Sequence, residues 1–166
     1  MACSAARGGR TLSEAFAIRD GAADDLAFVL DLGRRTIGDS VSAVRVAPFE
    51  LVRLNYDRLV EYARRQSHIL LVAESTFERL GFALLLDSLP DEVTGIPQAF
   101  VAYMAVEPHA RRRGVARSLL AAAERSARER GLPFVALMVT EDNVAARALY
   151  AQAGFVTERR LLCKAT

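Results

Sequence analysis

The sequence of 166 residues contains only two cysteines, Cys3 and Cys163, and they lie near opposite ends of the chain. This spacing argues against a disulfide framework and against a cysteine-based metal site. No apolar run approaches the roughly 18–20 residues that a membrane-spanning helix requires. The N-terminal residues also lack the apolar segment of a signal peptide. We therefore expect a soluble, cytoplasmic protein without a metal, in which residues 1–12 form a disordered tail.

Lysine is almost absent, since Lys164 is the only one and arginine carries nearly all of the positive charge. We interpret this bias, together with the abundant alanine, as a property of the coding sequence rather than a sign of function. The formal net charge is only +2, which argues against a protein whose whole surface binds nucleic acid. The chain has no internal repeat, linker or low-complexity segment, and its length predicts a single domain at residues 13–166.

The hydrophobic pattern predicts an α/β fold. Strands are predicted at residues 16–18, 69–73, 81–86, 99–106, 134–139 and 155–164. Helices are predicted at residues 22–35, 48–66, 114–130 and 143–154. The strand at 134–139 follows a helical crossover and is therefore parallel to the strand before it, whereas the short connection between the second and third strands requires antiparallel pairing. The order βααβββαβαβ thus predicts a mixed, mostly antiparallel sheet with helices on both faces.

A basic loop at residues 110–116, with the sequence Ala-Arg-Arg-Arg-Gly-Val-Ala, joins an apolar strand to an amphipathic helix. The start of a helix presents unpaired backbone N–H groups and the positive end of the helix dipole. Gly114, which has no side chain, lets an anion approach this backbone closely. A basic turn on its own is more often simply solvated, but together with the adjacent arginines this arrangement favours a phosphate-bearing ligand.

A second motif lies at residues 143–155, with the sequence Asn-Val-Ala-Ala-Arg-Ala-Leu-Tyr-Ala-Gln-Ala-Gly-Phe. Asn143 is a favourable N-cap for the predicted helix. Asn143 and Tyr150 are almost two helical turns apart, so they lie near one edge of the helix. The small side chains of Ala146 and Ala153 share that side and leave room for a ligand.

The two motifs together resemble the GNAT superfamily of N-acetyltransferases. The pyrophosphate loop of that family reads Gln/Arg-x-x-Gly-x-Gly/Ala, which Arg111, Gly114 and Ala116 match. Its next helix reads Asn-x-x-Ala-x-x-Leu-Tyr-x-x-x-Gly-Phe, and every fixed place of this pattern is present. The matching residues are Asn143, Ala146, Leu149, Tyr150, Gly154 and Phe155. The resemblance extends in element order from about residue 16 to the C-terminus, with the motifs in the second half.

The resemblance implies that the protein transfers the acetyl group of acetyl-CoA to an amine by direct attack in a ternary complex. In the family, the strand before the loop splays from its parallel neighbour, and the pantetheine arm lies in the gap. Tyr150 then corresponds to the general acid that protonates the departing thiolate. The implied cofactor-binding residues are Met104, Ala105, Val106, Arg111, Arg112, Arg113, Gly114, Val115, Ala116, Asn143 and Tyr150. The acceptor would be a small-molecule or peptide amine, and the family leaves a homodimer open.

The sequence does not identify a general base. Some relatives carry a glutamate at the place of Phe100, which cannot take a proton. Tyr103 is a candidate for substrate contact or a water relay, but a half-buried strand aromatic explains it equally well. Weaker candidates for a role in catalysis or substrate binding come from three groups. They are the acids Glu107, Glu141, Asp142, Asp87, Asp91 and Glu92, the loop residue His109, and Arg45, Tyr56 and Glu61 in the acceptor region.

Two other functions stay open at this point. The missing base is consistent with a non-catalytic module of the same fold that senses acyl-CoA. The arginines of the basic loop are alternatively part of a nucleic-acid surface, although the near-neutral net charge disfavours this. Within the acetyltransferase interpretation, antibiotic, polyamine, amino acid and protein N-terminus are all compatible acceptors.

Overall fold

A computed structural model describes residues 15–165, so the predicted tail at residues 1–12 lies outside the described residues. The strands are β1 (Phe16–Asp20), β2 (His68–Ser75), β3 (Arg79–Leu86), β4 (Ala99–Val106) and β5 (Val135–Leu137). The α-helices are α1 (Leu26–Thr36), α2 (Phe49–Arg65), α3 (Val115–Glu129) and α4 (Val144–Gln152). Short 3-10 helices are η1 (Ala23–Asp25), η2 (Ile37–Ser40) and η3 (Pro108–Ala110). Each predicted helix and all but one of the predicted strands are thereby confirmed.

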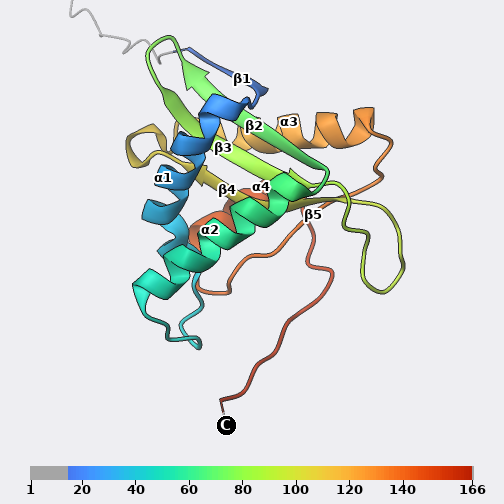
Figure 1. The fold of residues 1–166 in the computed structure, drawn as a ribbon. Coiled ribbons are helices and arrows are strands. Elements are labelled where there is room, and N and C mark those ends of the chain that lie inside the picture. The colour runs from blue at the N-terminus through green and yellow to red at the C-terminus, as the bar shows by residue number, and fades with distance from the viewer. Residues whose placement is uncertain (1–14, 166) are drawn as a thin grey trace, which may run out of the picture.

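The strands form one mixed sheet in the order β1-β2-β3-β4-β5. The first four strands pair antiparallel, and β4 pairs parallel with β5. Helix α3 covers one face of the sheet, and α1 and α2 cover the other (Figure 1). The predicted α/β architecture is therefore correct. It places the C-terminal end of β4 next to the N-terminal end of α3.

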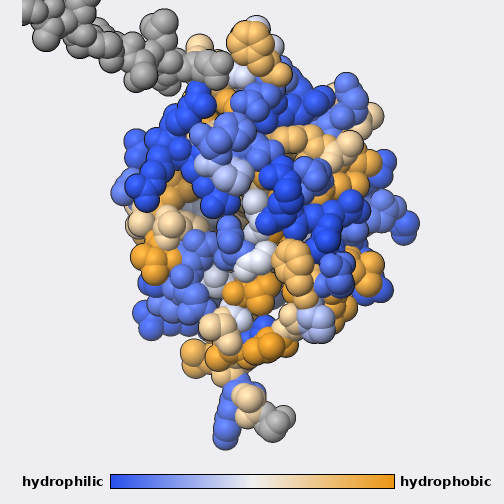
Figure 2. Space-filling model, turned by 90° about the vertical axis from the view of Figure 1, so that its left-hand side faces the viewer, coloured by the Kyte–Doolittle hydropathy of each residue, from blue (hydrophilic) through white to orange (hydrophobic). Residues whose placement is uncertain are grey.

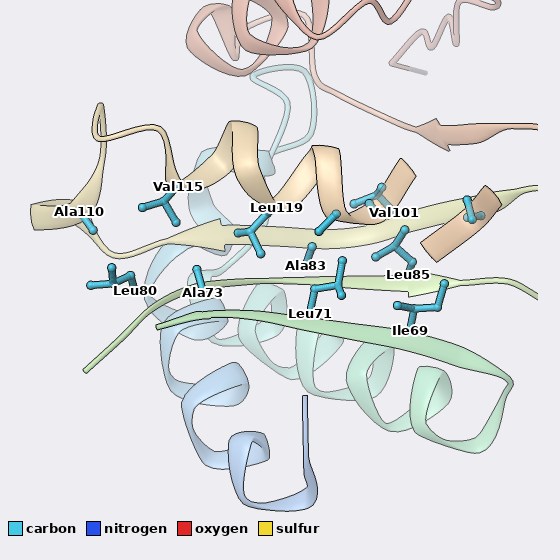
Figure 3. Packing of buried hydrophobic residues seen from close by; sticks show 14 residues of the cluster. Ile69, Leu71, Ala73, Leu80, Ala83, Leu85, Val101, Ala110, Val115 and Leu119 are labelled. Atoms are coloured by element: carbon cyan, nitrogen blue, oxygen red, sulfur yellow. The ribbon is translucent and has the colours of Figure 1, made fainter. Parts of the chain in front are cut away.

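Two apolar cores lie on the two faces of the sheet. Because both faces are covered, β3 is buried from Leu80 to Leu86 and reads as a continuous apolar run. The core under α3 includes Ile69, Leu71, Leu85, Val101 and Leu119 (Figure 3). The core under α1 and α2 includes Leu32, Tyr56, Val72, Phe82 and Tyr103. None of the described helices is long and apolar enough to cross a membrane.

The strand predicted at residues 155–164 does not form. Residues 156–165 have no strand assignment and are exposed, and they run away from the body of the molecule (Figure 1). Arg159 instead forms ion pairs with Asp91 and Glu92 of the 87–98 loop. The sequence pattern was misleading because a strand needs a partner edge, and β5 offers an edge of only three residues.

A buried carboxylate links the start of α1 to the sheet. The Asp25 side chain is only 1% exposed, and it accepts hydrogen bonds from Arg19 at 2.7 Å, Arg79 at 2.5 Å and the Ala22 amide at 2.8 Å. The hydrogen bond from Arg19, with smaller contributions from Ala22 and Arg79, holds the pKa of this carboxyl well below its usual range, against the opposing effect of burial. The charged form of Asp25 is therefore the one that the fold stabilises.

Replacing Asp25 with asparagine should lower the free energy of unfolding by about 3 kcal/mol, because one partner of a buried ion pair is lost. Since the folded-state pKa is depressed, the Asp25 contribution is present above the unfolded pKa of about 4 and is lost as pH falls below it. Urea unfolding at pH 7 and pH 3 measures both effects. Asp24→Asn, at the exposed neighbouring position, is the matched control, and equal urea midpoints for the two variants would contradict this account.

Candidate cofactor and catalytic site

Strands β4 and β5 separate halfway along β4. They pair only at Ala99 with Val135, Phe100 with Ala136 and Val101 with Leu137. Strand β4 continues to Val106. Its edge beyond Val101 therefore has no partner strand among residues 15–165, and we call the space beside this unpaired edge the gap.

A β-bulge in β4 lies at the point of separation. Leu84 pairs with Tyr103 and Leu85 pairs with Val101, so Ala102 is an extra residue with no partner on β3. A bulge inverts the alternation of side chains along a strand. Before it, Val101 faces the α3 core, whereas after it Tyr103 packs in the core under α1 and α2. The bulge thereby turns Tyr103 toward α1.

The same alternation decides which backbone amides of β4 point into the gap. The Glu107 amide donates to the Leu80 carbonyl at 2.8 Å, which directs the backbone of Glu107 toward β3. Because successive residues of a strand point to opposite edges, Met104 and Val106 direct their N–H and C=O groups into the gap. Ala105 directs its amide toward β3. The contribution of Ala105 to cofactor binding stays a prediction.

The basic loop forms an anion-binding geometry at the start of α3. Gly114 has φ 86° and Arg112 has φ 63°, so the chain turns through two left-handed residues before the helix. Ser118 is the first residue of α3 whose amide hydrogen-bonds to the backbone of the loop. It donates to the Gly114 carbonyl at 3.0 Å. Within the described part of the chain, the amides of Gly114, Val115 and Ala116 have no acceptor. An anion at the helix start would satisfy them.

There is also room for an anion at this place. A Cβ atom added to Gly114 would have no heavy atom within 4 Å. Arg111 and Arg112 are exposed and Arg113 is half-buried, while the Val115 side chain is buried in the core and so offers only its backbone. Figure 2 shows the side of the molecule that lies at the left in Figure 1, where hydrophilic residues cover much of the upper part and hydrophobic ones gather toward the bottom. These features suit a negatively charged, solvent-exposed group.

The two sequence motifs meet at Asp39, on the connection between α1 and α2. The Asp39 side chain pairs with Arg111 at 3.3 Å, and its backbone carbonyl accepts from the Asn143 side chain at 3.1 Å. Asn143 also caps α4, because its side-chain oxygen accepts from the Ala146 amide at 3.1 Å. Arg111 further donates to the Val106 carbonyl at 3.4 Å. The basic loop, the end of β4 and the start of α4 are thus neighbours in space.

Tyr150 lies on α4, where its side chain is half-buried. Burial, and to a smaller extent the nearby Tyr103, raises the pKa of the Tyr150 phenol above its ordinary value. Its ring packs edge-on against Phe155, with ring centres 5.8 Å apart. Among residues 15–165 no group hydrogen-bonds to its hydroxyl. Tyr150 therefore stays protonated at neutral pH and has a hydrogen available for a ligand.

Comparison with known proteins identifies the family of this chain. A family model described as the acetyltransferase (GNAT) family matches residues 40–155. The chain belongs to the GNAT family. No match was found among curated proteins.

Solved structures share the GNAT fold along nearly the whole chain. A protein from Pyrococcus furiosus described as an acetyl transferase has a TM-score of 0.79 at 25% identity. The alignment covers 92% of this chain and 100% of that one. The aminoglycoside N-acetyltransferase AAC(6')-Iy, solved with the bisubstrate analogue CoA-S-monomethyl-acetylneamine, has a TM-score of 0.64 at 20% identity over 92% and 98% of the two chains. A ribosomal-protein-alanine N-acetyltransferase from Brucella melitensis biovar Abortus 2308 has a TM-score of 0.68 at 20% identity over 92% and 99%.

Several candidates weighed from the sequence have structural roles in this GNAT protein. The Tyr56 hydroxyl is buried and donates to the Val29 carbonyl at 2.7 Å. The Glu107 side chain is only 14% exposed and pairs with Arg35 at 2.7 Å. Other candidates pair with groups outside β4 and β5. These pairs are His109 with Glu78, Asp87 with Arg130, Glu61 with Arg64 and Arg65, Glu141 with Arg147, and Asp142 with the Ala43 amide.

Two surface hollows of about 230 and 240 Å³ lie away from the gap, one between α1 and α2 and one between β1 and α3. They contain none of the motif residues, so the site rests on the strand separation and not on these hollows. Within residues 15–165, no group of three or more histidine, cysteine or acidic side chains is placed to hold a metal.

Thr36 and Asp39 are the residues of this region that sequence reasoning missed. Both belong to the α1–η2 segment, where the sequence has no motif. Their proximity to β4 and α4 depends on long-range packing, and no local pattern signals it.

Proposed function

We propose that this protein transfers the acetyl group of acetyl-CoA to the amine of an acceptor by direct attack in a ternary complex. The observation that carries the proposal is the gap between β4 and β5, with the amides of Met104 and Val106 directed into it and the start of α3 at its end. In AAC(6')-Iy, a structural neighbour, the bound analogue joins CoA to an aminoglycoside. The same fold therefore has room for both substrates.

The residues of the basic loop fit the pyrophosphate of CoA. The amides of Gly114, Val115 and Ala116, with those of Arg112 and Arg113, would hold the phosphate oxygens, and the guanidinium groups would balance their charge. Arg111 would exchange its contact with Asp39 for a phosphate. Asn143 would lie along the pantetheine arm. When bound, acetyl-CoA supplies an acyl group activated as a thioester.

The Met104 and Val106 amides would donate to the thioester oxygen as negative charge develops on it. The acceptor nitrogen forms a bond to the acetyl carbon, and the carbon–sulfur bond breaks. Tyr150 gives its proton to the departing sulfur, and the proton lost by the amine restores the phenol. A raised pKa keeps Tyr150 in the acid form that this step needs.

A thiol-release assay with acetyl-CoA and four amines tests the proposal. The amines are kanamycin, spermidine, lysine and a peptide that begins with alanine, chosen to represent the four acceptor classes. We expect CoA at 100 times its Kd to stabilise the fold by about 2.7 kcal/mol, and at least one amine to release free thiol. Stabilisation by CoA without thiol release from any amine would favour the non-catalytic sensor. Absence of both effects would contradict the proposed function.

A further inference from the structure

The Tyr103 side chain packs between the sheet and the two helices, α1 and α2, that cover this face of the sheet. It is 8% exposed. Its ring centre lies 5.0 Å from that of Tyr56 and 6.1 Å from that of Phe82. The ring is packed on both sides, and its hydroxyl lies beside Thr36 at the end of α1.

The hydrogen bonds of Thr36 decide the direction of the Tyr103 hydroxyl. The Thr36 hydroxyl lies 2.8 Å from the Leu32 carbonyl and 3.0 Å from the Tyr103 hydroxyl. A carbonyl oxygen only accepts, and Thr36 has a single hydroxyl hydrogen, so Thr36 donates to Leu32. Tyr103 must then donate its own hydrogen to Thr36. The Tyr103 oxygen is left with lone pairs, so toward any other group it acts as an acceptor.

This oxygen lies at the end of α1, beside the η2 segment that contacts both sequence motifs. Thr36, the hydrogen-bond partner of Tyr103, stands three residues before Asp39, which pairs with Arg111 and accepts from Asn143. Tyr150, the proposed acid, lies on α4, whose N-cap residue is Asn143. Burial raises the pKa of Tyr103, so Tyr103 is neutral at physiological pH and does not serve as a base.

We infer that Tyr103 binds the acceptor amine, its hydroxyl oxygen accepting a hydrogen from the attacking nitrogen, and that Thr36 positions this oxygen. The inference rests on the proposed function and identifies a residue that binds the acceptor amine in that reaction. An amine nitrogen held through one of its N–H groups can direct its lone pair at the thioester carbon. The two tyrosines then have opposite roles, since Tyr103 accepts from the nucleophile and Tyr150 donates to the leaving group.

The experiment compares Tyr103→Phe, Thr36→Val, Thr36→Ser and the double variant Tyr103→Phe/Thr36→Val. Turnover is measured with acetyl-CoA and whichever of kanamycin, spermidine, lysine or the alanine peptide the wild-type protein acetylates fastest. Loss of one hydrogen bond should raise KM for the amine about tenfold in Tyr103→Phe and in Thr36→Val. Thr36→Ser keeps the hydroxyl and should restore the wild-type KM. The double variant should be no worse than Tyr103→Phe, because both changes remove one interaction.

Two further measurements separate amine binding from a structural effect. The Kd for CoA should be unchanged in all four variants, and Tyr62→Phe, at an exposed position on α2, should leave KM unchanged. An unchanged amine KM in Tyr103→Phe, or a tenfold weaker CoA Kd, would overturn the inference while leaving the proposed function intact. Absence of turnover by the wild-type protein would overturn both.

Discussion

Replacing Gly114 with alanine should weaken CoA binding about a hundredfold, which corresponds to about 2.7 kcal/mol. The added methyl group would occupy the open space above the start of α3, where no atom of the chain lies within 4 Å. It would also strain a residue at φ 86° and disturb the amides that follow. Two charge-assisted hydrogen bonds, each worth roughly 1.5–3 kcal/mol, are enough to account for the loss. Calorimetric titration with CoA measures it.

Gly131→Ala is the matched control for this variant. Gly131 follows the opposite end of α3, has φ 70°, and likewise has no heavy atom within 4 Å of an added Cβ. Both variants should lose about 1–2 kcal/mol of stability, because alanine in a left-handed conformation is strained. Only Gly114→Ala should lose CoA affinity. Equal CoA affinities in the two variants would show that the start of α3 does not bind the pyrophosphate.

Replacing Tyr150 with phenylalanine should lower kcat by about 10²–10⁴-fold, the usual contribution of a general acid. The ring is kept, so its packing against Phe155 and the Kd for CoA should change little. Steady-state kinetics with saturating amine measures kcat. Tyr62→Phe, which removes an exposed hydroxyl on α2, is the control, and a Tyr150→Phe enzyme as fast as Tyr62→Phe would exclude Tyr150 as the acid.

The pH dependence of kcat gives a second test of Tyr150. The protonated phenol is the active form, so activity is retained below its pKa and lost above it. Since burial raises this pKa above the ordinary value of about 10, wild-type kcat should show no loss from Tyr150 between pH 7 and pH 9.5. A fall in kcat centred near pH 8 would contradict this assignment.

The elements of the site could be predicted from the sequence because each has a local signal. The apolar run of β4, the glycine before α3 and Asn143 before α4 mark their elements, and all three are where the pattern placed them. The two motifs also identified the family. The loop geometry at Arg112 and Gly114 follows from the same short segment.

The relations between elements could not be predicted, because they depend on distant parts of the chain. The bulge at Ala102 arises from the register of β3 against β4, and without it Tyr103 would face α3. The contacts of Asp39 with Arg111 and Asn143 join residues more than 70 positions apart. The strand predicted at residues 155–164 was wrong for the same reason, since its sequence does not specify a partner edge.

The most direct test of the central claim follows an isotopically labelled acetyl group from acetyl-CoA to the amine by mass spectrometry. The wild-type protein and Gly131→Ala should label at least one of kanamycin, spermidine, lysine or the alanine peptide, and at subsaturating acetyl-CoA Gly114→Ala should do so about a hundredfold more slowly. A wild-type protein that labels none of these amines, or a Gly114→Ala variant that matches Gly131→Ala, would contradict the account.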